Sequence, residues 1–116
     1  MRRLPILASL LLAACQGFEP TGAQQIDPRP EWRAVWDSAQ ACTQRRGDYR
    51  RLRFFVVPVE GMQLAGHTEG TDIYLREDYL TPFVVKHEMI HALGVHHHPY
   101  TPFVQPCHAT WESAND

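Results

Sequence analysis

The fold has to accommodate a cluster of histidines in the last third of the chain. Residues 87–99 read HEMIHALGVHHHP and contain five of the seven histidines. His87 and His91 are four residues apart, a spacing that places two side chains on the same face of an α-helix, roughly 5–6 Å apart at Cβ. Two imidazoles at that separation can bind one metal ion. The segment therefore predicts a helix with a metal-binding face.

The flanking residues predict where this helix begins and ends. Thr81 precedes Pro82. Proline suits the first helical position, and the residue before a proline is kept out of the helical region, as an N-cap residue is. Gly94 can end the helix in a left-handed conformation. On such a helix Glu88 projects beside the histidine pair, where it can accept a proton from water.

The histidine spacing continues beyond the helix. Gly94 follows His91 by three residues and His97 follows Gly94 by three, so the segment matches H-E-x-x-H-x-x-G-x-x-H. This pattern resembles the motif of the metzincin metallopeptidases. The resemblance implies that His87, His91 and His97 bind Zn²⁺ and that Glu88 is the catalytic general base.

The chain departs from the metzincin pattern after its third histidine. Metzincins carry a methionine in a tight turn below the metal, whereas Met62 and Met89 both precede His97, and 19 residues follow it. The resemblance covers residues 52–98. The chain is therefore at most a reduced relative of that family.

The third ligand has alternatives. His96, His97 and His98 are consecutive. Spacing favours His97, and His98 is the rival because the proline after it would stiffen its backbone; we expect His96 to be exposed. Glu112 and Asp116 form the E-x-x-x-D pattern of a gluzincin, which offers an acidic ligand instead.

The N-terminus has the layout of a secretory signal peptide. Arg2 and Arg3 precede an apolar stretch, residues 4–14, that is too short to span a bilayer. It ends in LAAC, which resembles the lipobox of bacterial lipoproteins. The resemblance implies that residues 1–14 are removed and that Cys15 is acylated with fatty acids such as palmitate. The alternative is an ordinary signal peptide with an incidental cysteine.

A lipid anchor predicts the location of the mature protein. Two acyl chains hold a protein stably on a membrane, so we expect it in the bacterial cell envelope, facing the periplasm or the exterior. Gln16 favours the outer membrane if the organism is Gram-negative. Residues 15–29 are expected to be a flexible tether. Loss of two arginines lowers the formal charge from −2 to −4, which argues against a nucleic-acid partner.

Two cysteines remain in the mature chain, Cys42 and Cys107. In an oxidising compartment such a pair predicts one disulfide; two buried thiols are the alternative. The bridge would hold the loop that carries the third ligand against the first helix. It could thereby replace the missing methionine turn.

The remaining pattern predicts one small α+β domain over residues 30–116. A scaffold helix is indicated by apolar residues at spacings of three and four, ending near Gly47: Trp32, Val35, Trp36, Ala39 and Cys42. Strands are predicted at 52–59, 62–67 and 73–75. His67 is expected at the surface. The active-site helix would pack beneath this sheet of about three strands.

The sequence thus predicts a zinc metalloendopeptidase, or a peptidase-like hydrolase, acting on a peptide or protein. We expect the strand at 73–75 to be an edge of the sheet, with which an extended substrate could pair. The alternative is a non-enzymatic zinc-binding lipoprotein that captures metal or uses zinc structurally. Structural zinc has four protein ligands, whereas catalytic zinc keeps a water. Glu88 favours catalysis. The small size of the chain favours the alternative, because few residues remain to form the walls of a substrate cleft.

Overall fold

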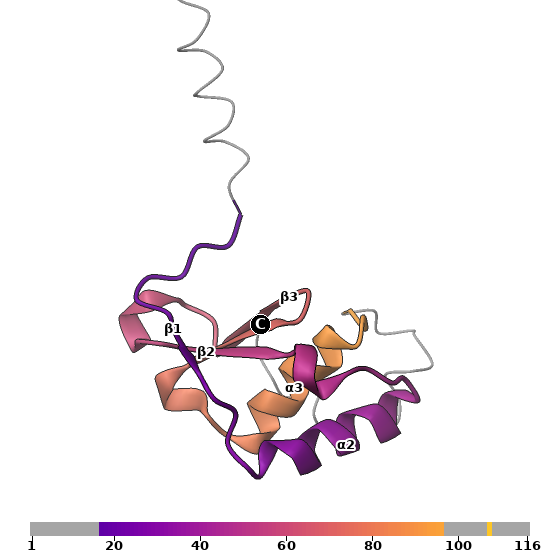
Figure 1. Cartoon of the computed structure of the whole chain (residues 1–116). Helices are drawn as coiled ribbons and strands as arrows, with labels where there is room; N and C mark the ends of the chain where they lie inside the picture. The colour runs from indigo at the N-terminus through magenta and orange to yellow at the C-terminus, as the bar shows by residue number, and fades with distance from the viewer. Residues whose placement is uncertain (1–16, 97–106, 108–116) are drawn as a thin grey trace, which may run out of the picture.

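A computed structural model describes residues 17–96 and Cys107. Two helices and a four-stranded sheet form the domain, which confirms the α+β class. The elements in chain order are β1 (Gln24–Ile26), α2 (Trp32–Thr43), β2 (Arg53–Val57), β3 (Gly66–Glu69), β4 (Asp72–Arg76) and α3 (Pro82–Ala92). The strand order is β1-β2-β4-β3 (Figure 1). β2 and β4 are parallel, and the two outer pairs are antiparallel.

The fold begins earlier in the chain than the sequence pattern indicated. Gln24–Ile26, inside the segment expected to be a tether, forms β1 and pairs with β2. Gln24 lies opposite Val56, and Ile26 lies opposite Phe54. A three-residue strand with two glutamines has no alternation that would distinguish it from a loop. Its pairing with β2 places the start of the domain before residue 30.

The strand at residues 73–75 is not an edge strand, so that prediction was wrong. It belongs to β4, which pairs with β2 on one side and with β3 on the other. Ile73 and Leu75 are both 0% exposed. The chain crosses over between β2 and β4, which makes these two strands parallel, and β3 pairs along the far side of β4. Within the described residues the edges of the sheet are β1 and β3.

Both helices cover the same face of the sheet (Figure 1). The inward side chains of the strands and helices form a single core: Trp32, Trp36, Ala39, Phe54, Ile73, Leu75, Val85, Met89 and Ile90 are among its buried members. The alternate residues of the strands, such as Phe55 and Tyr74, point to the opposite face, as the pleat of a strand requires. The apolar stripe that predicted α2 therefore packs into the core.

Helix α2 ends four residues before the glycine that was expected to stop it. Gln44 follows Thr43 in a left-handed conformation with φ 57°. Thr43 donates its hydroxyl to the carbonyl of Ala39 at 2.8 Å and is fully buried. Gly47 has a packing role instead, because a Cβ there would lie 3.0 Å from the Trp36 ring.

The predicted disulfide is present between Cys42 on α2 and Cys107, and it spans 65 residues of sequence. Cys107 is 2% exposed and belongs to the core. The bridge therefore fixes a residue beyond the histidine-rich segment to the scaffold helix. Among the residues described, no helix has the length and apolar character needed to cross a bilayer.

Candidate metal and catalytic site

Helix α3 begins and ends where the sequence predicted. Thr81 caps it with its hydroxyl, which accepts from the backbone N–H of Val84 at 3.3 Å, and Pro82 occupies the first turn. The last helical residue is Ala92. Gly94 has a φ of 87°, a left-handed conformation that suits glycine, and its N–H donates to the carbonyl of His91 at 2.9 Å. The segment H-E-x-x-H therefore lies within one regular helix.

His87 and His91 lie together on one face of α3. Their ring centroids are 5.0 Å apart, with the ring planes at 75°. His87 is 0% exposed, and His91 is partly buried. His91 Nδ1 lies 3.0 Å from the carbonyl oxygen of Val95. When Nδ1 carries the proton and donates to that carbonyl, Nε2 has the lone pair that can bind a metal, as is usual for histidine ligands.

The side chain of Glu88 is buried between α3 and β3, and it is 1% exposed. The hydroxyl of Thr68 on β3 lies 2.8 Å from Glu88 Oε1 and 3.0 Å from the Glu88 carbonyl oxygen. The hydroxyl has one proton, which it can donate to either oxygen. A buried carboxylate is stable only when hydrogen bonds replace its lost hydration. Thr68 therefore both stabilises the Glu88 carboxylate and restricts its orientation.

Gly66 permits this close approach of β3 to the helix. A Cβ at Gly66 would lie 2.8 Å from Glu88 Cγ, 2.9 Å from Oε2 and 3.0 Å from Cδ. Separations of that size require something to move. The sequence analysis did not identify Gly66 or Thr68 as site residues. The available signal was a glycine inside a strand pattern, which often marks a close backbone approach.

The structure brings together three of the predicted site residues, His87, Glu88 and His91. Of the consecutive histidines it describes only His96, which is exposed as expected, with its ring centroid 6.2 Å from that of His91. The candidate third ligands His97 and His98 lie outside the described residues, as do Cys15, Glu112 and Asp116. Within residues 17–96 and Cys107, no three histidine, cysteine or acidic side chains are grouped to hold a metal ion.

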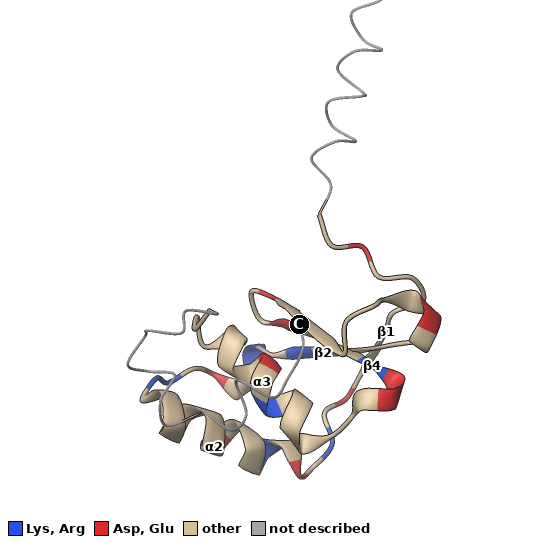
Figure 2. Ribbon diagram, turned by 180° about the vertical axis from the view of Figure 1, so that it is seen from behind, with Lys and Arg blue, Asp and Glu red and all other residues tan. Residues whose placement is uncertain are grey.

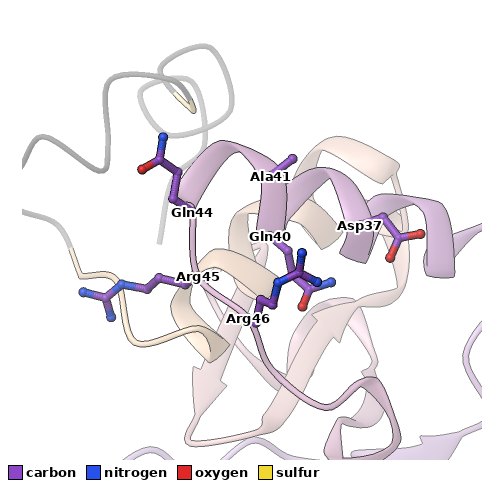
Figure 3. Close-up of a pocket in the computed structure, with 6 residues that line it drawn as sticks. All are labelled: Asp37, Gln40, Ala41, Gln44, Arg45 and Arg46. Carbon is purple, nitrogen blue, oxygen red and sulfur yellow. The ribbon is translucent and has the colours of Figure 1, made fainter.

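A separate pocket lies at the C-terminal end of α2 (Figure 3). It is lined by Asp37, Gln40, Ala41, Gln44, Arg45 and Arg46. Figure 3 shows the Arg46 side chain alongside Gln40, whereas Arg45 extends away from the helix. Arg45 Nη1 donates to the carbonyl of Leu93 at 3.1 Å, a favourable position for a cation at the C-terminal end of α3. None of these residues belongs to the histidine motif, so the pocket is distinct from the candidate site.

Searches among protein-family models, curated proteins and solved structures found no match to this chain. Its function therefore has to be inferred from the residues and geometry of the site.

Proposed function

We propose that this protein is a zinc-dependent hydrolase of the metallopeptidase type, tethered to the bacterial cell envelope by a lipid. The observation that carries the proposal is the position of Glu88. This carboxyl group is buried beside the His87–His91 pair and accepts a hydrogen bond from Thr68 at 2.8 Å. A structural zinc site has no use for an acidic residue held next to its ligands.

The donor set of α3 fits zinc. Imidazole nitrogens are common zinc ligands, at about 2.0–2.1 Å, and two of them at i and i+4 converge on one ion. His91 has its Nδ1 next to the Val95 carbonyl, the outer hydrogen bond that orients most histidine ligands. His87, His91 and His97 would hold the ion, with His98 as the rival third ligand. Zinc, when bound, would polarise a scissile carbonyl and acidify a water toward a pKa of about 7.

The role of Glu88 is proton transfer. Its carboxylate would accept the proton of the attacking water and pass it to the leaving amine. Thr68 would keep the carboxylate in one orientation, because its hydroxyl lies within hydrogen-bond distance of both the side chain and the main chain of Glu88. General acid–base catalysis of this kind typically contributes about 10²–10⁴-fold to the rate.

The edge strand β3 gives the proposed reaction a place for its substrate. β3 pairs with β4 on one side and, in the described part of the chain, is the last strand of the sheet. An extended peptide can add to such an edge through main-chain hydrogen bonds. Thr68 and Gly66, which contact Glu88, lie on the same strand. A peptide bound along β3 would therefore run beside the general base.

The zinc content of purified variants tests the metal part of this proposal. His87→Ala and His91→Ala should each lose zinc together with any peptidase turnover. Glu88→Gln should keep zinc and lose turnover, because the amide has the same shape and cannot accept the proton. Unchanged turnover in Glu88→Gln would leave the non-enzymatic zinc-binding lipoprotein as the better account.

The same measurement identifies the third ligand. His97→Ala should empty the site as His91→Ala does. His96→Ala is the matched control and should retain zinc, because His96 is exposed. If His98→Ala alone empties the site, the histidine before the proline is the ligand and the metzincin spacing does not apply.

The lipid anchor is tested separately. Cys15→Ser should release the protein from membranes or block its processing. Mass spectrometry of the mature N-terminus should find acyl chains on Cys15, and an unmodified N-terminus at another residue would contradict the lipoprotein assignment.

A further inference from the structure

The segment before β1 is attached to the domain at two points. We call residues 17–22 the N-terminal strap. The Phe18 ring stacks on His67 with centroids 4.0 Å apart, and it meets the edge of Tyr74 at 4.9 Å. Phe55 in turn stacks on Tyr74 at 4.7 Å. Because Phe55, Tyr74 and His67 are neighbours across three strands, Phe18 covers the end of a continuous aromatic row.

The second attachment is at Thr21. Its backbone N–H donates to the Gly61 carbonyl at 3.0 Å. Gly61 allows the strap to lie this close, because a Cβ there would collide with the Thr21 carbonyl oxygen. Gly22 then turns the chain toward β1 with a φ of 77°. The strap is therefore part of the folded domain, although it lies in the segment expected to be a flexible tether.

The strap lies on the outer face, which we define as the face of the sheet that bears Phe55, Tyr74 and His67. The neighbouring residues on the same strands point the other way: Ile73 is buried in the core, and Thr68 contacts Glu88 on α3. Helices α2 and α3 thus cover the opposite face. Figure 1 shows the N-terminal segment, drawn in indigo, entering on the side of the sheet away from both helices.

The proposed lipid attachment point is separated from this face by only a few residues of chain. Cys15 precedes Phe18 by three residues, and a fully extended chain spans at most about 3.6 Å per residue, so the two Cα atoms are no more than about 11 Å apart. We infer that the outer face lies against the lipid bilayer and that the helical layer with Glu88 points into the aqueous compartment. This inference rests on the proposed lipid anchor. It implies that the substrate is a water-exposed peptide and not a membrane-embedded one.

The chemistry of the outer face suits a bilayer surface. Its arginines are paired with carboxylates: Arg53 with Asp72 at 2.6 Å, and Arg76 with Asp78 at 2.8 Å. His67 Nε2 lies 3.1 Å from Glu69 Oε1. Figure 2 marks both basic and acidic positions along the strands and the connections between them. The two arginine–carboxylate pairs leave the outer face without a large excess of one charge. The connection between β2 and β3, whose Gly61 accepts a hydrogen bond from the strap, exposes Leu64, which is 36% accessible. With the outer face against the membrane, an exposed apolar side chain of this connection can enter the interfacial region of the bilayer.

Quenching of a fluorescent label by the bilayer tests the orientation. The mature protein is reconstituted in phosphatidylcholine vesicles whose headgroups carry a quencher. A fluorescent amino acid replaces either Leu64, in the connection that contacts the strap, or Gln40, a half-buried residue of α2 in the helical layer. The label at position 64 should be quenched at least threefold more strongly than the label at position 40. Phe18→Ala should reduce that ratio toward one, because the strap then no longer orients the domain.

Phe83→Ala is the matched control. Phe83 is a phenylalanine on α3 with 38% of its surface exposed, and its loss should leave the quenching ratio unchanged. Equal quenching at positions 64 and 40 in the acylated protein would overturn the orientation while leaving the hydrolase proposal intact. An N-terminus without lipid, found by mass spectrometry of the same sample, would overturn the anchor and the orientation together.

Discussion

Replacing Gly66 with alanine should destabilise the protein through one identifiable contact. The new methyl group would lie 2.8–3.0 Å from three side-chain atoms of Glu88, which is 1% exposed and has little room to move. Overpacking of a filled interior typically costs about 1–3 kcal/mol. Alanine also lowers the conformational entropy of the unfolded chain, and this offsets about 0.4–1 kcal/mol of the overpacking cost. We therefore expect Gly66→Ala to lower the free energy of unfolding by about 1–2 kcal/mol.

Urea unfolding of the metal-free protein, in the presence of a chelator, measures this loss without a contribution from bound ions. Glu88→Ala removes the atoms that the new methyl group would meet. In that background Gly66→Ala should be neutral or slightly stabilising. Gly70→Ala is the control, because a Cβ there meets nothing within 4 Å but φ is +61°. Its effect should be the same in both backgrounds. Equal losses for Gly66→Ala with and without Glu88 would refute the packing argument.

Three further perturbations have expected outcomes. Cys42→Ser opens a loop of 65 residues, so chain-entropy arguments predict that the free energy of unfolding, measured in urea, falls by about 4 kcal/mol. A reductant should destabilise the wild type by the same amount and leave the variant unchanged. Thr81→Ala removes the helix cap and should cost about 1 kcal/mol in the same assay. Thr68→Val should lower kcat about 10–100-fold at unchanged zinc content, since hydrogen bonds to charged groups contribute about 1.5–3 kcal/mol. Thr68→Ser keeps the hydroxyl and should restore kcat. Equal kcat values for the valine and serine variants would exclude an orienting role for Thr68.

The helix that carries His87 and His91 could be predicted in detail, because the residues that define it are neighbours in the sequence. The Thr81-Pro82 start and the Gly94 end depend on backbone preferences of neighbouring residues, and the structure confirms both. The pairing of His87 with His91 follows from helix periodicity alone. The disulfide was predicted from the number of cysteines in the mature chain. Cys42, its half on α2, lies on the apolar stripe that the periodicity had identified.

The features that were missed depend on strand pairing between distant segments. β1 lacks an apolar alternation, so only its pairing with β2 defines it. The three apolar residues of β4 are compatible with an edge or a central strand until the order of the sheet is known. Thr68 and Gly66 acquire their roles because β3 lies beside α3, twenty residues later in the chain. Neither residue carries a local signal that points to a carboxylate.

The N-terminal segment was misjudged for a related reason. Its composition of glycine, proline and glutamine is typical of a tether. Phe18 is attached only because an aromatic row assembles across three strands, and no local pattern reports that assembly. The proposed orientation of the domain on the membrane depends on this attachment, so it too has no local signal in the sequence.

A structure of the zinc-loaded protein tests the central claim most directly, because the number of protein ligands separates a catalytic ion from a structural one. We expect one zinc ion bound by His87, His91 and one histidine of the 96–98 run. We expect a water as the fourth ligand, within hydrogen-bond distance of Glu88. Four protein ligands with no water, or an ion bound away from His87 and His91, would contradict the account.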